Sequence, residues 1–233
     1  RERVQQAIDE LGYVPDKVAQ SMRSRRTMTF ACVMRDFTVP VLSTFVDAMQ
    51  REIDSFGFSL MVASSYHDRE RELSLLQGFD QRRIDGLVIA SSSESDAALL
   101  SAMKAVNFPI VLIDRDAPAH FDRVMINHAQ GMVDAVHHLA TLVHRAVALI
   151  TGDPGLHPTR HRLQGYRQGM RACQLSVKPA WVRAVSFGGD VGYHETLRLL
   201  DSAYPPTAII AGGSALLPGV LRAARERRLR IPQ

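Results

Sequence analysis

Cysteine is scarce in this 233-residue chain, tryptophan occurs once, and no apolar run is long. Cys32 and Cys173 lie in periodic, core-like surroundings, so we expect reduced packing residues and neither a disulfide framework nor a cysteine metal site. A membrane-spanning helix needs about 20 consecutive apolar residues, and a signal peptide needs an apolar stretch that the charged first residues lack. With 46% hydrophobic and 22% charged residues, we expect a soluble, globular, cytoplasmic protein without a membrane partner.

Familiar catalytic motifs are also missing. The sequence contains no GxxxxGKS/T phosphate-binding loop, no GxGxxG dinucleotide motif and no HExxH zinc motif. His137 and His138 are adjacent in a helical run and therefore point to different faces, which does not suit metal binding. His157 and His161 have a four-residue spacing, but acids that would complete a site are not evident. We therefore expect no enzyme activity, no cofactor and no metal site.

Positive charge is concentrated near the start of the chain, whose formal net charge is +4. Four basic residues follow Asp16 with no acid among them: Lys17, Arg23, Arg25 and Arg26. This density suits contacts with nucleic-acid phosphates, and a solvated basic linker is the alternative. A second basic run over residues 225–230 is interpreted as the exposed end of an amphipathic helix, which needs no partner.

The spacing of apolar residues predicts two short helices, over residues 1–12 and 15–24, before the main body. From Met28 onward, strand-like runs alternate with helical segments, in the order MTFACVM, FSLMVAS, DGLVIAS, FPIVLID, RVMIN, AVALITG and PPTAIIAGG. Helices are expected near residues 41–56, 69–83, 96–106, 130–143, 160–172, 193–202 and 216–228. This alternation predicts an α/β fold of two doubly wound parallel-sheet lobes, with the first four strands buried on both faces and a ligand cleft between the lobes.

Several stretches match one known family in order and spacing. The opening RERVQQAIDELGYVPDKVAQSMRSRRT resembles the last headpiece helix and the hinge helix of LacI/GalR regulators. DGLVIAS, PIVLIDR, HHLATLVHRAVALITG, RLQGYRQGM and PPTAIIAGG resemble landmarks of that family's core, which is similar to periplasmic sugar-binding proteins. The resemblance implies a remnant of the helix-turn-helix headpiece and hinge over 1–27, an N-terminal lobe over 28–128 and an incomplete C-terminal lobe over 129–233. It also implies that further headpiece helices precede Arg1 and further core elements follow Gln233.

The function implied by this resemblance is that of a DNA-binding transcriptional repressor. Its core would bind a small-molecule effector, a sugar or sugar derivative, and control the affinity for operator DNA allosterically. A homodimer is implied because two hinges must meet on a near-palindromic operator. The alternative is a transport-type solute-binding protein, which shares the core fold. The headpiece-like opening and basic hinge favour the regulator.

Residues for DNA contact are implied by the hinge resemblance. Met22 matches the leucine that wedges between base pairs in this family, and the alternative is an exposed or dimer-packing residue of a short helix. We expect Lys17, Arg23, Arg25 and Arg26 to contact DNA phosphates.

Residues for effector binding are implied by the core resemblance. Arg162 in RLQGY matches the family's arginine that contacts hydroxyl or carboxylate groups, and a solvated helix arginine is the alternative. Six further residues are expected at the cleft by position: Val41, Leu42, Ser92, Arg115, His157 and Ser214. Ser214 stands where the family usually has an aspartate that bonds sugar hydroxyls. Together with Arg160, the basic residues of this set suggest an anionic effector, such as a sugar phosphate or sugar acid.

Overall fold

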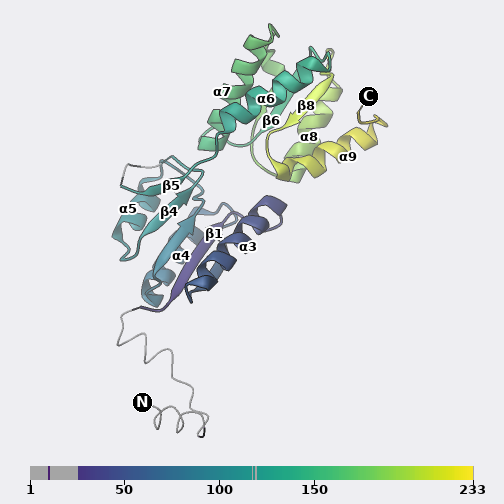
Figure 1. The fold of residues 1–233 in the computed structure, drawn as a ribbon. Helices are drawn as coiled ribbons and strands as arrows, with labels where there is room; N and C mark the ends of the chain where they lie inside the picture. The colour runs from purple at the N-terminus through teal and green to yellow at the C-terminus, as the bar shows by residue number, and fades with distance from the viewer. Residues whose placement is uncertain (1–9, 11–25, 117, 119, 233) are drawn as a thin grey trace.

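The computed structural model describes residue 10 and residues 26–116, 118 and 120–232. Helices and parallel strands form two α/β lobes, which confirms the predicted fold class (Figure 1). In the part of the chain so described, no helix is long and apolar enough to cross a membrane. The two helices predicted over residues 1–12 and 15–24 lie, apart from Glu10, outside the described residues.

The first lobe is built on a parallel sheet of five strands in the order β2-β1-β3-β4-β5. The strands are β1 (Thr29–Met34), β2 (Ser59–Ser64), β3 (Gly86–Ile89), β4 (Ile110–Ile113) and β5 (Asp122–Val124). The last four residues of β1 are fully buried, because β1 has a neighbouring strand on each side. The expectation that β2 is buried on both faces is wrong, since none of its residues is buried and Val62 is 45% exposed. As an edge strand, β2 has a paired strand on one side only.

Each helix of the first lobe begins soon after a strand ends. These helices are α3 (Pro40–Ser55), α4 (Arg69–Arg82) and α5 (Ala97–Ala105). Side chains cap two of them: Asp68 accepts a hydrogen bond from the Arg71 backbone N–H at 2.8 Å, and Asp96 accepts one from the Leu99 backbone N–H at 2.9 Å. The third helix, α3, has proline at its first position, where no backbone donor is needed. The observed bounds agree with the predicted ones to within a residue or two.

The second lobe is built on three parallel strands in the order β7-β6-β8. Its strands are β6 (Val147–Thr151), β7 (Val182–Ala184) and β8 (Ala208–Ala211). Its helices are α6 (His128–Thr141), α7 (His157–Ala172), α8 (Gly189–Leu200) and α9 (Leu217–Glu226), with short 3-10 helices at Pro179–Trp181 and Ser214–Leu216. The central strand β6 is buried along its whole length. Strand β7 was not predicted, because it has three residues and Arg183 interrupts its apolar pattern.

Two glycines on α7 allow it to lie close against α6. A Cβ atom on Gly165 would overlap the carbonyl oxygen of Ala129, and one on Gly169 would press against Val136. Because only glycine leaves this space free, the two helix backbones approach closely. This packing fixes the position of the first turn of α7, which begins at His157.

Buried apolar clusters form a core in each lobe. One cluster joins β1, β3 and β4 to α4 and α5, a second joins β6 to α6 and α7, and a third lies on the other face of β6. Cys32 and Cys173 are free thiols, and burial raises the pKa of Cys32 to about 12.

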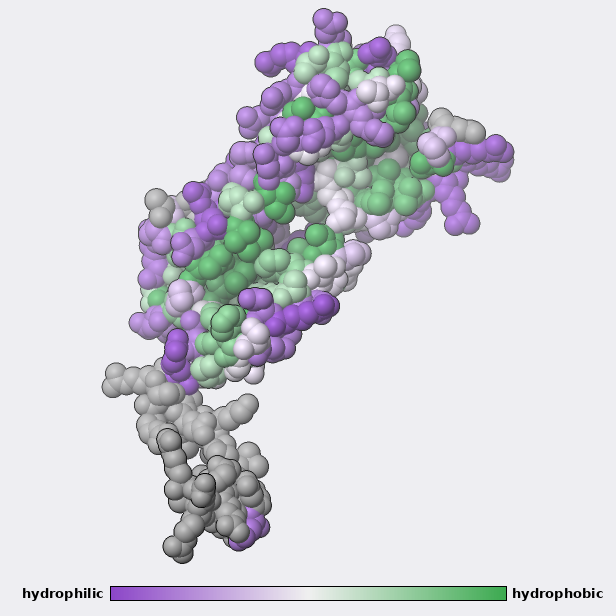
Figure 2. Space-filling view, viewed as in Figure 1, coloured by the Kyte–Doolittle hydropathy of each residue, from purple (hydrophilic) through white to green (hydrophobic). Residues whose placement is uncertain are grey.

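Apolar residues also gather on the visible surface of both lobes, and the surface is hollowed between them (Figure 2).

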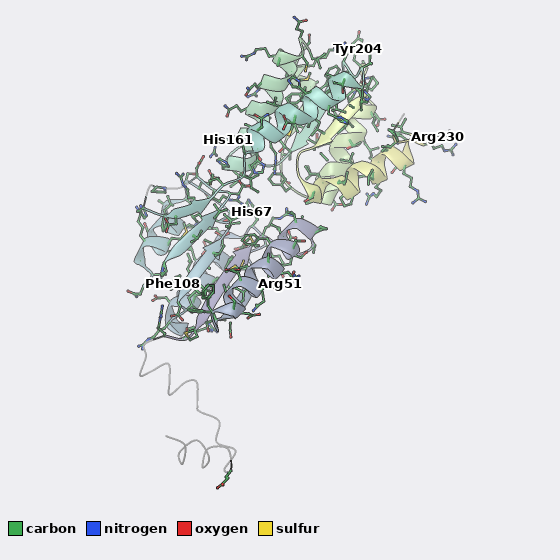
Figure 3. All side chains as sticks on the ribbon, viewed as in Figure 1. Arg51, His67, Phe108, His161, Tyr204 and Arg230 are labelled. Atoms are coloured by element: carbon green, nitrogen blue, oxygen red, sulfur yellow. The ribbon has the colours of Figure 1, made fainter. Side chains whose placement is uncertain are left out.

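The strand orders place both ligand-binding edges at the junction of the lobes. In open parallel sheets, ligands bind beyond the carboxyl ends of strands where the strand order reverses. This reversal falls between β1 and β3 in the first sheet and between β6 and β8 in the second. His67, which follows β2, and His161, on α7, both lie near this junction (Figure 3).

Candidate functional site

A cleft of about 470 Å³ lies between the two lobes. Its lining comes from the first lobe after β1 and β2 and from the second lobe after β7 and β8: Arg35, Asp36, Thr38, Val39, Pro40, Tyr66, Phe187, Gly188, Gly189, Ser214, Ala215 and Pro218. The cleft therefore lies at the carboxyl ends of strands, as the topology requires. Its volume falls in the range of small-molecule sites.

Phe187 is the central apolar residue of this cleft. A Cβ atom on Gly152 or Gly213 would overlap the Phe187 ring, so these glycines allow the ring to lie against the ends of β6 and β8. Across the cleft, Arg35 Nη1 donates a hydrogen bond to the Phe187 carbonyl oxygen. On the second lobe, the Arg162 guanidinium lies 5.4 Å from the centre of the same ring, within cation–π distance. Phe187 therefore provides a planar apolar surface beside the Arg162 guanidinium, while its backbone carbonyl oxygen binds Arg35.

Tyr66, which lines the cleft, and the next residue, His67, both have unusual backbone conformations. Their φ angles are 53° and 62°, in the left-handed region that non-glycine residues rarely adopt. Two such residues in succession indicate a loop that the surrounding structure holds in place, as often occurs at ligand sites. Burial lowers the pKa of His67, and the charges of Arg115 and Arg35 lower it further. These effects favour the neutral form of the imidazole.

Arg115 and Arg162 are the two partly buried cations behind the cleft. Arg115 Nε donates to the Ser91 carbonyl oxygen at 2.6 Å, and its Nη1 donates to the Asp114 carbonyl oxygen at 2.9 Å. Burial lowers the pKa of both guanidiniums. The charges of carboxylates oppose this shift, those of Glu94, Asp114 and Glu72 at Arg115 and that of Asp114 at Arg162, and the charge of Arg115 adds to the shift at Arg162. Within the described residues, no carboxylate oxygen lies within 4.0 Å of either guanidinium. Both groups can therefore still bind a negatively charged oxygen.

Asp114 and Asp116, which follow β4, contact histidines of the second lobe. His128 Nε2 lies 2.6 Å from Asp114 Oδ2, and this hydrogen bond and charge lower the pKa of Asp114 although burial raises it. His157, only 5% exposed, has Nε2 3.9 Å from Asp114 Oδ1 and Nδ1 3.2 Å from Asp116 Oδ1. The His161 ring stacks on His157 with centroids 3.9 Å apart. Burial lowers the pKa of His161.

Arg160 has its charge compensated, unlike the two cleft arginines. Its Nη2 donates to Glu94 Oε2 and to Asp116 Oδ2, each at 2.6 Å. The backbone N–H of His157 donates to Glu94 Oε1, also at 2.6 Å. Glu94 and Asp116 belong to the first lobe and Arg160 to the second, so this network joins the lobes. Arg160 therefore contributes less to an anion site than its charge suggests.

The structure brings some of the predicted site residues together and separates others. Ser214 lines the cleft. Arg162 is not among the lining residues, but its guanidinium lies beside the ring of Phe187, which is one of them. Val41 and Leu42 follow the lining residues Val39 and Pro40 in the first turn of α3, but they are not among the lining residues, and Val41 is 60% exposed. The Ser92 backbone N–H donates to Glu72 Oε1 at 2.7 Å.

Of the residues predicted to contact DNA, only Arg26 is described. Arg26 Nε lies 3.6 Å from Asp85 Oδ1, and its side chain is 67% exposed. Asp85 also accepts hydrogen bonds from the backbone N–H groups of Thr27 and Thr29. The chain that enters β1 is therefore attached to the loop before β3. Lys17, Met22, Arg23 and Arg25 lie outside the described residues.

Sequence reasoning missed most of the residues at the junction, including the following four. Arg35, Tyr66 and Phe187 line the cleft, and Asp116 approaches the histidines of α7. A signal was available for three of them, because Arg35, Tyr66 and Asp116 come within three residues of a strand's carboxyl end. Phe187 had only a weak signal, since β7 itself was not predicted. Asp116 could not be paired with His157 from sequence, because that contact depends on how the lobes meet.

Comparisons with known proteins agree on one family. Residues 27–233 match the family model described as periplasmic binding proteins and sugar binding domain of LacI family. The transcriptional regulator DegA of Bacillus subtilis is 28% identical over 235 residues, covering 100% of this chain and 69% of DegA. The transcriptional repressor PurR of Klebsiella pneumoniae has the same identity and coverage. A crystal structure of a protein assigned as a ribose operon repressor, from Burkholderia thailandensis, is 27% identical with a TM-score of 0.79, covering 89% of this chain and 77% of that one.

Proposed function

Because the chain belongs to the family of periplasmic binding proteins and LacI-family sugar-binding domains, we propose that it is the sensing core of a DNA-binding transcriptional repressor. Its inter-lobe cleft binds a small-molecule effector, a sugar or sugar derivative that carries an anionic group. The observation that carries this proposal is the pair of partly buried guanidiniums, Arg115 and Arg162, which have no carboxylate partner among the described residues. Backbone carbonyl oxygens accept from Arg115 and the Phe187 ring lies beside Arg162, but neither contact neutralises the positive charge. Burying a charge that no adjacent carboxylate neutralises is costly, so such groups are typical of sites that an anion completes.

The contacts follow from the arrangement of the cleft. The two guanidinium forks bind the anionic oxygens, which a planar group can do with two hydrogen bonds. The Phe187 ring provides an apolar surface for a sugar face, and the Ser214 hydroxyl can donate to or accept from a ring hydroxyl. Val41, Leu42 and Ser92 remain proposed further contacts of the effector, whereas His157, whose imidazole faces Asp114 and Asp116, is not proposed to contact it. In this proposal the cleft residues bind the effector and catalyse no reaction.

Regulation is proposed through the position of the two lobes. An effector that fits only one arrangement shifts the population toward it and so changes the distance between paired hinges. In this proposal the chain acts in the cytoplasm as a homodimer, with residues 1–27 as a headpiece and hinge segment and lobes over 28–128 and 129–233. Met22, Lys17, Arg23, Arg25 and Arg26 contact operator DNA. The alternative of a transport protein is less well supported, because DegA and PurR match the whole chain and are named as transcriptional regulators.

A thermal-shift screen of the chain against neutral sugars, sugar phosphates, sugar acids and purines tests this proposal. A ligand at 100 times its Kd stabilises the folded state by about 2.7 kcal/mol, which corresponds to roughly 5–10 °C for a chain of this size. We expect anionic ligands to give this shift, and the shift to disappear in Arg162→Ala and Arg115→Ala. Arg167→Ala, an exposed arginine on the same helix, is the matched control and should keep it. Equal shifts with neutral sugars, or a shift that persists in Arg162→Ala, would reject the anion site.

A further inference from the structure

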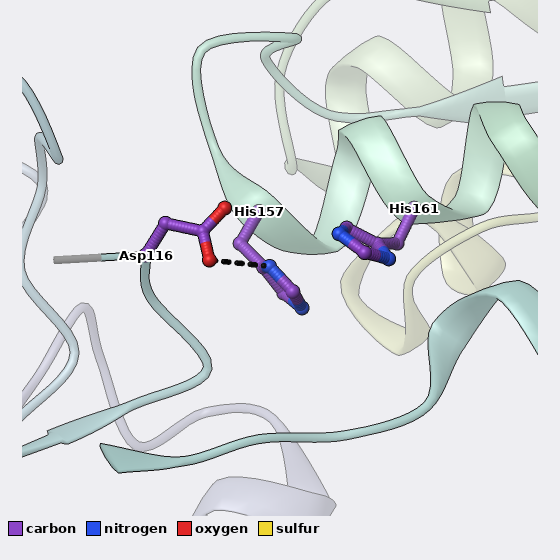
Figure 4. Close-up of side chains that lie close together, drawn as sticks. All are labelled: Asp116, His157 and His161. Atoms are coloured by element: carbon purple, nitrogen blue, oxygen red, sulfur yellow. Dashed lines mark ion pairs between the residues drawn. The ribbon is translucent and has the colours of Figure 1, made fainter. Parts of the chain in front are cut away.

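Three metal-ligating side chains meet at the junction of the lobes, outside the cleft lining. Asp116 comes from the loop after β4, and His157 and His161 come from the first two turns of α7 (Figure 4). One ligand atom from each lies within 4.8 Å of the other two. Sequence reasoning noted the histidine pair and rejected it because no acid was evident. The structure supplies that acid from the other lobe.

The donor set is suited to a first-row divalent transition ion. His157 and His161 are four residues apart on one helix face, the spacing with which helices present two imidazoles to zinc. Imidazole nitrogen and carboxylate oxygen are ordinary Zn²⁺ ligands, with bond lengths of about 2.0–2.2 Å. In a tetrahedral site such bonds place the ligand atoms about 3.4 Å apart. The ligand atoms, which lie within 4.8 Å of one another, must therefore move closer together, and the stacked rings of His157 and His161 must turn, to close around an ion.

Unsatisfied polar atoms give a second, independent indication. His157 Nδ1 and Asp114 Oδ1 are buried and have no hydrogen-bond partner. His157 Nδ1 faces Asp116 Oδ1 at 3.2 Å, but this contact lacks hydrogen-bond geometry. Buried polar atoms almost always have partners, so an unpartnered imidazole nitrogen beside a carboxylate oxygen points to a missing ligand. An ion between these two atoms would satisfy the imidazole nitrogen.

The surrounding charges are compatible with a cation. Arg160 is paired with both Glu94 and Asp116, and it uses Asp116 Oδ2, so Oδ1 remains available on the histidine side. Arg123 Nη1 lies 3.7 Å from Asp116 Oδ1, but that side chain is 40% exposed and can turn into solvent. Asp114 Oδ1 lies 3.9 Å from His157 Nε2, the ring nitrogen that would not bind the ion. The Asp114 carboxylate adds negative charge there and can orient the His157 ring.

We propose that Asp116, His157 and His161 form a site for a divalent transition ion such as Zn²⁺ that bridges the two lobes. The three protein ligands leave a fourth position for water. Because Asp116 and the histidines belong to different lobes, an ion bound to all three favours the arrangement in which they meet. The chain then has a second ligand that acts on the same lobe arrangement without occupying the cleft.

Isothermal titration of the metal-free chain with Zn²⁺ tests this site, and Co²⁺ serves as a spectroscopic probe. We expect one ion per chain, with a visible Co²⁺ absorption typical of four-coordinate geometry, and a rise in melting temperature. His161→Gln should weaken Zn²⁺ binding by about 100-fold or more, since even outer-shell changes cost 10–100-fold. Asp116→Asn, which keeps the side-chain volume, should weaken it by at least about tenfold. His138→Ala, at an exposed histidine of α6, should bind as the parent does.

Two results would overturn the proposal. Equal affinity in His161→Gln and the parent would show that any binding occurs elsewhere. Parental affinity in Asp116→Asn would show that the histidines bind the ion alone, without joining the lobes. His161 and Asp116 are both partly exposed, and circular dichroism of each variant separates a lost ligand from a lost fold.

Discussion

Substitution of Glu72 tests how the loop that orients Arg115 is held in place. This carboxyl is fully buried on α4, where Oε1 accepts from the Ser92 backbone N–H at 2.7 Å and Oε2 accepts from Ser91 Oγ at 3.0 Å. The Ser91 carbonyl oxygen in turn accepts from Arg115 Nε at 2.6 Å. Glu72 therefore holds the loop that follows β3, and this loop orients one of the two cleft arginines.

Removing the carboxyl should cost stability and loosen Arg115. In Glu72→Ala, the half-buried Ser92 N–H loses its acceptor and the buried Ser91 hydroxyl keeps only the Ser93 carbonyl oxygen at 3.1 Å. Each hydrogen bond to a charged group is worth about 1.5–3 kcal/mol. The gain from no longer burying a charge offsets part of this loss, so we expect a net destabilisation of about 2–4 kcal/mol. For a chain of this size, the melting temperature should then fall by roughly 5–15 °C. Glu72→Gln is the matched control, because its amide oxygen can still accept from Ser92 and it carries no charge.

The pH dependence distinguishes the charge from the packing. Burial raises the pKa of Glu72 above its ordinary 4.5, although the hydrogen bonds from Ser91 and Ser92 oppose the shift. A carboxyl with a raised pKa binds its proton more tightly in the folded state than in the unfolded one. Its contribution to stability is therefore complete below pH 4.5 and is lost as the pH rises through the raised value. Relative to Glu72→Gln, the parent should thus lose stability between pH 4.5 and neutrality.

Urea unfolding of the three proteins at several pH values from 4.5 to 8 measures both effects. If the difference between parent and Glu72→Gln does not change with pH, the carboxyl does not titrate as burial requires. If Glu72→Ala is as stable as the parent, the two hydrogen bonds do not hold the β3 loop. Either result would refute the reasoning. Ligands that stabilise the parent should also stabilise Glu72→Ala less, because Arg115 loses its fixed position.

The packing of the second lobe gives the remaining predictions. Gly165→Ala places a Cβ atom on the carbonyl oxygen of Ala129 and should destabilise the fold by about 3 kcal/mol, whereas Gly131→Ala, with no atom within 4 Å, should stabilise α6 by about 0.5–1 kcal/mol. Thermal unfolding of both variants checks this, and similar losses would contradict the close approach of the helices. Tyr166→Phe removes the hydroxyl that donates to the Val147 carbonyl oxygen at 2.8 Å and should cost about 1–2 kcal/mol in urea unfolding. If the free energy of unfolding does not fall, this buried hydrogen bond does not stabilise the fold.

Local sequence patterns predicted most of the helices and strands, but not the burial of the edge strand β2 or the presence of the edge strand β7. The helix starts of the first lobe were predictable where capping residues such as Asp68 and Asp96 mark them. Helices α7 and α8 begin three and four residues before their predicted starts, at His157 and Gly189, and no side-chain cap marks either position. Burial of β2 was mispredicted because an apolar strand has the same sequence pattern at the edge of a sheet as at its centre. Strand β7 was missed because three residues carry too little periodicity. In each case the missing information was the identity of the neighbouring element.

The site was less predictable than the fold, because its contacts join residues distant in sequence. Arg162 was found through the family resemblance, but its contact with Phe187 depends on the helix and the β7 loop meeting. Asp116 and His157 are 41 positions apart and belong to different lobes. Spacing rules describe ligands on one element, so they detect His157 and His161 and cannot supply a third ligand from another lobe.

The contacts that join the lobes are suited to control by ligands. Arg160 joins the lobes through Asp116, whose side chain is 45% exposed, and through Glu94, whose side chain is 6% exposed. Exposed ion pairs contribute only about 0–1 kcal/mol, and the desolvation of a buried partner offsets much of its attraction. Arg35 joins the lobes through a single hydrogen bond to Phe187. Such contacts favour this arrangement without locking it, so a ligand that prefers it by about 1–3 kcal/mol changes the population severalfold or more. An anion held by Arg115 and Arg162 and an ion held by Asp116 and the histidines would favour the same arrangement. By linkage, each would then raise the affinity for the other by the same factor.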